Sequence, residues 1–398
     1  MHESMNRWVM GMLRKISASL LMGCLLLAFC IPCVFAEPAE QVRKAPQVSA
    51  QSAVLINADT GSVLYEKNAR EKLPMASTTK IMTAWLTLEA AAAQDKVVTV
   101  TEEMVRVEGS SMGLMPGYKL HLSDLAVGML LASGNDAANT AAIAIDGSIE
   151  AFAARMNERA SEIGMQDTHF VTPSGLDAEE HYSTAYDMAL LGAAAMQDEA
   201  FSQIACQRQL AVDFVYPEIT AYYTNHNKLL RLYEDCIGVK TGFTKKSGRC
   251  LVSAAERDGV SLVAVTLNAP DDWNDHQALY DYGFSLFSSY TLDGGETQYK
   301  ADVVGGMADS VLLTAGKQEV FLTKEEYAAL ECTVEQIPFL YAPVKAGDKA
   351  GCIRYELNGK TVAELPLTAK QAVTKQAPQE KNFWQKVGAL FSDLFQGT

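Results

Sequence analysis

Residues 73–80 read Leu-Pro-Met-Ala-Ser-Thr-Thr-Lys and lead directly into a stretch with helical spacing. From Ser77 to about Ala93 the chain contains no glycine or proline, and its large apolar residues recur at three- and four-residue intervals. The pattern predicts a helix that begins at Ser77 and carries Lys80 on the same face. The alternative is a serine that only caps the helix, with the lysine in solvent.

Ser77 and Lys80 have the residue types and the spacing of a nucleophile and its base. A hydroxyl in the first helical turn lies beside free backbone N–H groups and the positive end of the helix dipole, which favour a developing oxyanion. A lysine on the same face can accept the hydroxyl proton if burial keeps its amine neutral. A serine-x-x-lysine match is common by chance, so other motifs in the chain must show whether this pair is catalytic.

Two short motifs farther along the chain supply that context. Ser133-Gly134-Asn135 lies between two predicted helices, and Lys240-Thr241-Gly242 follows a strand-like run and begins a hairpin that returns through residues 250–255. Each tripeptide is weak by itself, since a helix cap and an edge-strand lysine are simpler explanations. Their order after the serine-lysine pair predicts one site assembled from three segments.

A competing serine motif can be dismissed. Residues 109–113, Gly-Ser-Ser-Met-Gly, match the G-x-S-x-G elbow, whose serine requires a strand before it and a helix after it. Pro116-Gly117 follows at once and prevents a helix from starting there. Ser111 is therefore not expected to be a nucleophile.

The remaining periodicity predicts a mixed fold. Two strands at 53–57 and 62–65 flank a turn at 59–61, and two more at 250–255 and 261–267 flank a turn at 257–259. Between these strand pairs, helical patterns cover 122–131, 137–145, 149–163 and 184–196.

Composition bounds the kind of protein. The chain has 398 residues with a formal net charge of −15, 48% hydrophobic and 20% charged residues, which is typical of a globular chain of two domains. The acidic balance argues against nucleic acid as a partner. No H-E-x-x-H motif occurs, and the five cysteines after residue 36 have no zinc-type spacing, so no metal or cofactor is expected. Cys332 and Cys352 could pair, and the sequence leaves that open.

The N-terminal residues predict export. Arg7, Arg14 and Lys15 precede an apolar run at 16–31 and the small-residue pattern Val34-Phe35-Ala36. Residues 1–36 are therefore expected to be a secretory signal peptide, with an uncleaved membrane anchor as the alternative. Polar residues 37–47 follow as a linker.

The sequence pattern changes in the C-terminal part of the chain. Short alternating segments and the turn Asn358-Gly359 predict a small β-rich domain at 291–372, followed by a polar linker at 373–380. Apolar residues then recur on one helical face of residues 381–396. A helix there covers only about 22 Å, too short to cross a bilayer, so it is expected to lie in the membrane interface. The alternative is a helix that packs on its own protein.

The three motifs together resemble those of the active-site serine penicillin-recognising enzymes. The finer resemblance is to the low-molecular-mass penicillin-binding proteins, the serine D-alanyl-D-alanine carboxypeptidases, through residues 73–80, 131–138, 172–177 and 239–244. It implies an α/β (α+β) β-lactamase/transpeptidase-like domain at 48–290, in which a five-stranded antiparallel sheet has helices on both faces. A small all-β domain then follows.

The resemblance also implies roles for the serine and lysine side chains. Ser77 would be the nucleophile that carries the acyl ester, and Lys80 would be its general base. Ser133 would relay the proton to the leaving D-alanine. Asn135 would hold Lys80 and the substrate amide.

The same resemblance assigns the strand motif to substrate binding. Lys240 and Thr241 would bind the terminal carboxylate, and Lys240 would help to keep Lys80 neutral by like-charge repulsion. Gly242 would let the substrate lie close to the strand. The backbone N–H groups of Ser77 and Phe243 would form the oxyanion hole.

The implied activity is removal of the terminal D-alanine from peptidoglycan stem pentapeptides, with β-lactam antibiotics as covalent inhibitors. The enzyme would work on the outer face of the cytoplasmic membrane, attached at its surface through residues 381–396. One alternative is a non-catalytic module that binds β-lactams or peptidoglycan. A β-lactamase is disfavoured because no E-x-x-L-N-type segment, which would activate the deacylating water, lies between Asn135 and Lys240.

Overall fold

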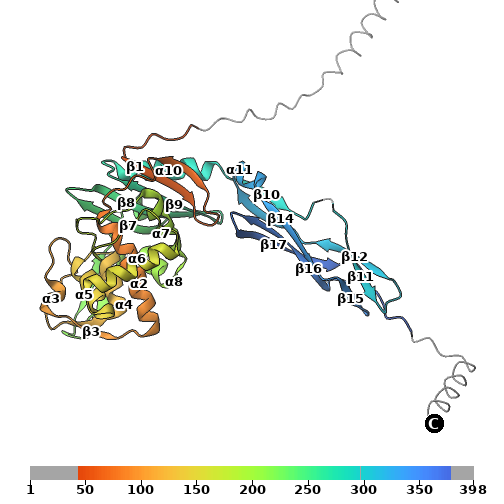
Figure 1. Cartoon of the computed structure of the whole chain (residues 1–398), viewed down its shortest axis with the longest axis horizontal. Coiled ribbons are helices and arrows are strands. Elements are labelled where there is room, and N and C mark those ends of the chain that lie inside the picture. The colour runs from red at the N-terminus through yellow and green to blue at the C-terminus, as the bar shows by residue number, and fades with distance from the viewer. Residues whose placement is uncertain (1–43, 296, 378–398) are drawn as a thin grey trace, which may run out of the picture. The chain divides into compact units, whose positions relative to one another are not determined.

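The computed structural model describes residues 44–295 and 297–377 (Figure 1). The predicted signal peptide at 1–36, most of the 37–47 linker, the end of the 373–380 linker and the predicted helix at 381–396 lie outside these residues. No helix within the described ranges combines the length and the apolar character needed to cross a membrane.

A five-stranded sheet forms the centre of the first domain. Its strand order is β2-β1-β9-β8-β7, and every neighbouring pair is antiparallel, as predicted. The strands are β1 (Ser52–Asn57), β2 (Val63–Lys67), β7 (Cys236–Thr244), β8 (Gly248–Arg257) and β9 (Val260–Leu267). Strand β7, which carries the Lys-Thr-Gly motif, lies at an edge and is therefore open on one side.

Helices cover both faces of this sheet, which confirms the predicted layering (Figure 1). Alternate residues of β1 belong to two apolar cores: Val54 and Ile56 to one, Ala53 and Leu55 to the other. Helices α2 (Lys80–Ala93) and α7 (Ala185–Gln197) pack in the first core, and α10 (Asp272–Ser285) packs in the second.

The other predicted helices form close to their expected bounds. They are α4 (Leu122–Leu130), α5 (Asn135–Asp146) and α6 (Ile149–Glu162). The sequence did not predict α10, because its apolar residues are interspersed with polar ones on every side. It also did not predict the short elements β3 (Val97–Thr99), α3 (Glu102–Val105), β4 (Lys119–His121), α8 (Glu199–Ala205), β5 (Gln209–Asp213), β6 (Thr220–Thr224) and α9 (Leu229–Leu232).

The beginning of the long helix differs from the prediction. Residues Ala76–Thr79 form a single 3₁₀ turn, η1, and the α-helix starts at Lys80. The backbone N–H and the hydroxyl of Thr78 both donate to the Met75 carbonyl, at 3.3 and 2.6 Å, which closes a tighter turn. Ser77 therefore lies in a rigid turn ahead of α2, not within its first α-helical turn.

The second domain is built from strands and has its own apolar core. One sheet has the order β14-β16-β17-β12-β11-β15, and β10 pairs with β13 separately. Its elements are β10 (Ser288–Leu292), β11 (Tyr299–Val304), β12 (Ser310–Ala315), β13 (Gln318–Leu322), α11 (Lys324–Ala328), β14 (Glu331–Gln336), β15 (Phe339–Tyr341), β16 (Lys349–Leu357) and β17 (Lys360–Ala369). The predicted Asn358-Gly359 turn joins β16 to β17, with both residues at positive φ as a type I′ turn requires.

Cys332 and Cys352 do not form a disulfide. They lie on neighbouring strands out of register, with Cys332 opposite Tyr355 and Cys352 opposite Glu335. The pairing that the sequence left open is thus excluded by strand register.

Candidate active site

Ser77 is held in its turn by two close approaches of backbone. Ala76 adopts φ 49°, a strained conformation for a residue other than glycine, directly before Ser77. A Cβ at Gly175 would lie 1.9 Å from the Ala76 carbonyl oxygen, and one at Gly242 would lie 3.0 Å from the backbone nitrogen of Ser77. Gly242 thus lets β7 pack directly against the serine turn. The resemblance had explained this glycine by the close approach of substrate instead.

Gly175→Ala is expected to destabilise the fold by about 3 kcal/mol, from backbone strain at φ +81° plus overlap with Ala76. The matched control is Gly164→Ala, which has a similar φ of +84° and open space around the added methyl group. Strain alone should lower its stability by only about 1 kcal/mol. Urea unfolding of both variants measures the difference, and equal losses would show that the contact with Ala76 is unimportant.

Lys80 connects the serine turn, the Ser133-Gly134-Asn135 motif and the loop that contains Ser174. Its Nζ lies 2.9 Å from Ser77 Oγ, 2.6 Å from Asn135 Oδ1 and 2.6 Å from the Ser174 carbonyl oxygen, and its side chain is completely buried. The two carbonyl oxygens can only accept hydrogen bonds. A neutral amine therefore uses both of its N–H groups on them and directs its lone pair at the Ser77 hydroxyl, the geometry of a base removing that proton.

The surroundings favour the neutral form of Lys80. Burial lowers its pKa well below the ordinary value, and repulsion from Lys240 lowers it further, while Asp136 opposes the shift. Lys240 is itself buried, which lowers its pKa to about 7. Two buried lysines near each other cannot both carry full charge near neutral pH.

Lys240→Met should move the acid limb of the pH–acylation profile to higher pH. The resemblance implies that Lys80 acts as the base through its neutral amine, so acylation should rise as pH passes upward through its pKa. Removing the Lys240 charge raises that pKa, and the rise in rate must then begin later. Stopped-flow acylation by a reporter β-lactam between pH 5 and 9 measures the midpoint.

His226 is the control for this pH profile, because burial and Lys240 lower its pKa as well. His226→Gln should leave the midpoint in place. A midpoint that stays fixed or moves down in Lys240→Met would contradict the proposed coupling between the two lysines.

The Ser133-Gly134-Asn135 motif lies at the start of α5, beside Ser77 and Lys80. The Asn135 side chain accepts from Lys80 and donates to the Glu108 carbonyl at 2.6 Å. Ser133 has φ 57° and is buried, and it lines the same cleft as Ser77. The structure thus brings Ser77, Lys80, Ser133 and Asn135 together.

Ser111, the serine of the dismissed motif, serves a structural purpose. Its hydroxyl donates to Asp136 at 2.6 Å, and the backbone N–H groups of Met112, Gly113 and Leu114 donate to the same carboxylate. Its segment forms a loop with no helix after it, as Pro116-Gly117 predicted. Asp136 thus fixes the loop beside the serine site.

His181 is a buried residue near the site that the sequence did not single out. Its Nδ1 accepts from the Val171 backbone N–H at 2.9 Å, so Nε2 carries the proton and donates to Thr79 Oγ1 at 3.0 Å. Burial lowers its pKa to about 4, which keeps it neutral near pH 7. His181 therefore ties the η1 turn to the loop that supplies the Ser174 carbonyl.

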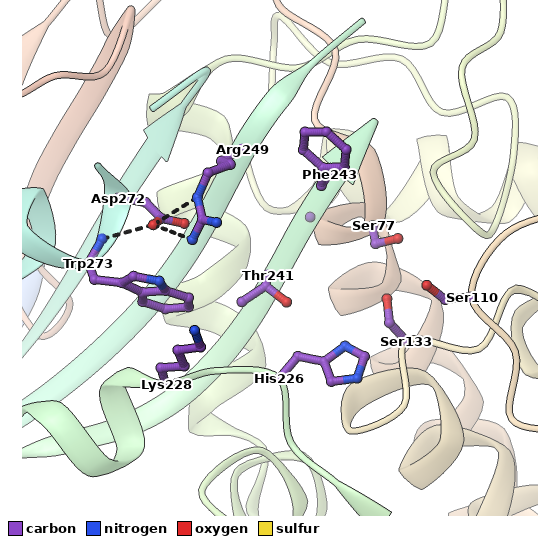
Figure 2. A pocket seen from close by; sticks show the side chains of 11 residues that line it. Ser77, Ser110, Ser133, His226, Lys228, Thr241, Phe243, Arg249, Asp272 and Trp273 are labelled. Atoms are coloured by element: carbon purple, nitrogen blue, oxygen red, sulfur yellow. Dashed lines mark hydrogen bonds and ion pairs between the residues drawn. The ribbon is translucent and has the colours of Figure 1, made fainter. Parts of the chain in front are cut away.

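These residues open onto a cleft of about 330 Å³. Figure 2 shows Ser77, Ser110 and Ser133 on one side, Arg249 and Trp273 on the other, and Thr241 on the strand between them. The lining residues are Ser77, Ser110, Ser133, His226, Lys228, Thr241, Gly242, Phe243, Arg249, Asp272 and Trp273. Lys240 is buried and donates to the Thr241 carbonyl at 3.0 Å, so the cations of this lining are Arg249 and Lys228.

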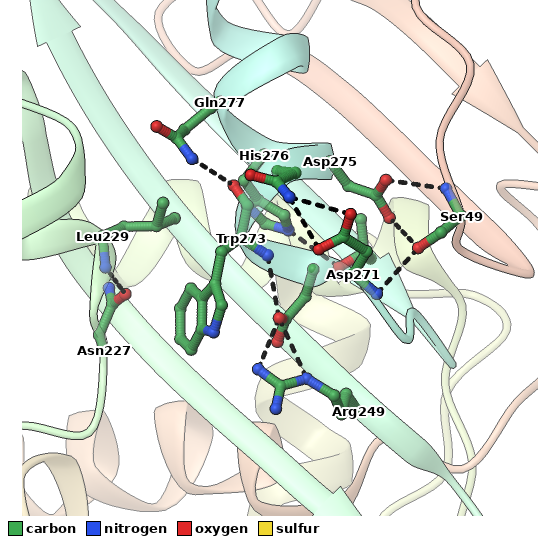
Figure 3. Close-up of polar contacts among 12 residues, drawn as sticks. Ser49, Asn227, Leu229, Arg249, Asp271, Trp273, Asp275, His276 and Gln277 are labelled. Carbon is green, nitrogen blue, oxygen red and sulfur yellow. Dashed lines mark hydrogen bonds and ion pairs between the residues drawn. The ribbon is translucent and has the colours of Figure 1, made fainter.

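Arg249 is fixed in its position by a buried acid. Its Nε and Nη2 donate to Asp272 Oδ1 at 3.1 and 2.6 Å, and its guanidinium lies over the Trp273 ring. Asp272 and Trp273 belong to the start of α10. Hydrogen bonds of Ser49 with Asp271 and Asp275 hold this end of the helix in place (Figure 3). The sequence did not single out Arg249. It lies opposite Phe243 in the β7–β8 hairpin, so aligning the two strands of the predicted hairpin would have placed it beside the Lys-Thr-Gly motif.

Fold and site together are those of an active-site serine enzyme in which a buried lysine contacts the serine hydroxyl. Comparison with known proteins identifies the family to which this chain belongs. The family model described as D-alanyl-D-alanine carboxypeptidase matches residues 39–271, and that described as penicillin-binding protein 5, C-terminal domain, matches residues 289–375. The chain belongs to the D-alanyl-D-alanine carboxypeptidase family of serine peptidases.

Relatives match along most of the chain. It is 32% identical over 376 residues to D-alanyl-D-alanine carboxypeptidase DacF of Bacillus subtilis (strain 168), covering 91% of this chain and 95% of that protein. It is 34% identical over 368 residues to DacC of Escherichia coli (strain K12), covering 86% and 88%. The crystal structure of penicillin binding protein 5 from Haemophilus influenzae aligns with a TM-score of 0.60 at 28% identity, covering 83% and 99%.

Proposed function

We propose that the chain removes the C-terminal D-alanine from peptidoglycan stem pentapeptides through an acyl ester on Ser77. The observation that carries the proposal is the triple contact of the buried Lys80 amine with Ser77, Asn135 and the Ser174 carbonyl. A neutral amine in that place supplies the base that a serine hydroxyl needs at neutral pH.

In the acylation step, Ser77 Oγ attacks the carbonyl carbon of the penultimate D-alanine while Lys80 takes the hydroxyl proton. The tetrahedral oxyanion lies between the backbone N–H groups of Ser77 and Phe243, an arrangement supported by the close passage of β7 at Gly242. The Lys80 ammonium gives its proton to the departing D-alanine amine through the Ser133 hydroxyl and becomes neutral again, while Asn135 orients Lys80 and the substrate amide. Water then attacks the ester as Lys80 accepts its proton, and Lys80 passes that proton to the Ser77 oxygen as the ester bond breaks.

Thr241 and Arg249 recognise the substrate's terminal carboxylate in this proposal. Thr241 lines the cleft on β7, and Arg249 is the cation that a buried acid and an aromatic ring hold on the opposite wall (Figure 2). A planar guanidinium suits a carboxylate. Lys240, which is buried, would bind the same carboxylate through its ammonium group and would also place its charge near Lys80.

The site of action in this proposal is outside the cytoplasm. Residues 1–36 would direct export, and the apolar face of residues 381–396 would hold the enzyme at the outer surface of the cytoplasmic membrane. β-Lactams would acylate Ser77 in the same way as substrate. The domain bounds at 48–290 and 291–372 are part of the same proposal.

Arg249→Leu tests the carboxylate assignment. Loss of a charge-assisted contact should lower kcat/KM for a peptide ending in D-Ala-D-Ala roughly 10- to 100-fold, while the same peptide with a C-terminal amide should react at an unchanged rate. The acid-to-amide ratio is insensitive to partial misfolding. Lys228→Met, which removes another cation from the same cleft, is the control. A ratio that falls only in Lys228→Met would move the assignment to that residue.

A further inference from the structure

The second domain carries an exposed apolar surface at one end. Strands β11 and β15 are parallel neighbours there (Figure 1). Their register places Val304 beside Tyr341, and both side chains are exposed. Phe339 and Tyr341 contact each other edge to face, with ring centroids 5.3 Å apart. Met307, in the turn after β11, is 70% exposed and Tyr341 is 71% exposed. We name Val304, Met307, Phe339 and Tyr341 the apolar tip.

The described chain ends beside this tip. The backbone N–H of Met307 donates to the Thr374 carbonyl at 2.8 Å, and the N–H of Gln376 donates to the Gly305 carbonyl at 2.8 Å. Residue 377 is the last described residue, and the sequence pattern of residues 381–396 presents an apolar face. The four residue steps from 377 to 381 reach at most about 14 Å.

We propose that the apolar tip is a second membrane contact, seated in the interfacial region of the same lipid surface that binds residues 381–396. The inference rests on the proposed peripheral location of the enzyme. A segment held in the interface keeps residue 377 within about 14 Å of the interface, and Met307 of the tip is bonded to the chain three residues before that point.

The chemistry of the tip fits a lipid interface. Tyrosine places an apolar ring toward acyl chains and a hydroxyl toward headgroups, and large exposed apolar side chains gathered in one place mark a contact surface. Lys345 and Lys375 are exposed nearby, while Asp302 lies opposite Phe339 in the strand register. The surface is thus not uniformly cationic, and the apolar side chains must supply most of the binding.

Quenching of tryptophan fluorescence by brominated lipids tests the proposal on residues 37–398. Tyr341→Trp should show additional quenching over the parent chain when bound to vesicles of phosphatidylglycerol and phosphatidylcholine with brominated acyl chains. Tyr222→Trp is the matched control, because Tyr222 is 69% exposed on the β5–β6 hairpin of the first domain. It should show no additional quenching.

Affinity gives a second measurement on the same chain. Met307→Ser/Tyr341→Ser should weaken vesicle binding about tenfold or more, with Tyr222→Ser unchanged. Both variants should acylate with penicillin at the parent rate, so failure of this inference is distinguishable from failure of the catalytic proposal.

Three results would overturn the inference. Vesicle binding without extra quenching of Tyr341→Trp would show that residues 381–396 bind alone. Shielding of Tyr341→Trp from acrylamide without vesicles would show that another part of the chain covers the tip. Absence of vesicle binding by the parent chain would remove both membrane contacts and leave the acylation chemistry standing.

Discussion

Ser77→Ala is expected to lower D-alanine release from a D-Ala-D-Ala peptide at least about ten-thousand-fold, because no other group can form the acyl ester. The substituted residue lies in a turn held by backbone contacts of Ala76 with Gly175 and of β7 with the turn, so the fold should persist. The measurement is enzymatic detection of free D-alanine, with thermal unfolding recorded on the same samples.

Ser111→Ala is the matched control for this experiment. It removes the serine of the competing G-x-S-x-G motif and one hydrogen bond to Asp136, without touching Lys80. Its activity should fall by less than about tenfold. Full activity in Ser77→Ala, or loss confined to Ser111→Ala, would place the nucleophile elsewhere.

Lys80→Met is expected to reduce the rate of acylation by a β-lactam by about a thousandfold or more, because it removes the base while leaving Ser77 in place. Methionine fills a similar volume but leaves the Asn135 and Ser174 oxygens without this donor, so thermal unfolding should show a modest loss of stability. The measurement is the second-order rate constant for labelling with a fluorescent penicillin.

Lys80→Arg distinguishes a base from a fixed positive charge. A guanidinium stays protonated at all working pH values, so the variant should be as slow as Lys80→Met. If Lys80→Arg instead retains most of the labelling rate, the lysine acts as a charge and the proposed proton transfer is wrong.

The sequence predicted those parts of the fold that depend on local pattern. Strands β1, β8 and β9 and helices α4 to α7 formed close to their expected bounds. Lys80 contacts Ser77 and Asn135, and Gly242 lies against the Ser77 backbone, so the three motifs meet at the serine turn. The resemblance supplied the five-stranded sheet and the all-β second domain, which local pattern alone does not specify.

What the sequence did not predict depends on contacts between distant segments. Asp272 and Trp273 reach Arg249 only because α10 packs back against the sheet, and no local pattern marks them. His181 bonds to Thr79, 102 residues earlier, for the same reason. The burial of Lys240 also follows from packing, since its place on an edge strand favoured an exposed lysine.

The central claim is an acyl ester on Ser77, and mass spectrometry of the penicillin-treated protein tests it most directly. Trypsin cleavage after Lys72 and Lys80 releases residues 73–80, whose fragmentation separates Ser77 from Thr78 and Thr79. The account predicts one penicillin equivalent per protein, located on Ser77 and persisting long after free penicillin is removed. An adduct on another residue, no adduct on folded protein, or one hydrolysed within seconds as in a β-lactamase would contradict it.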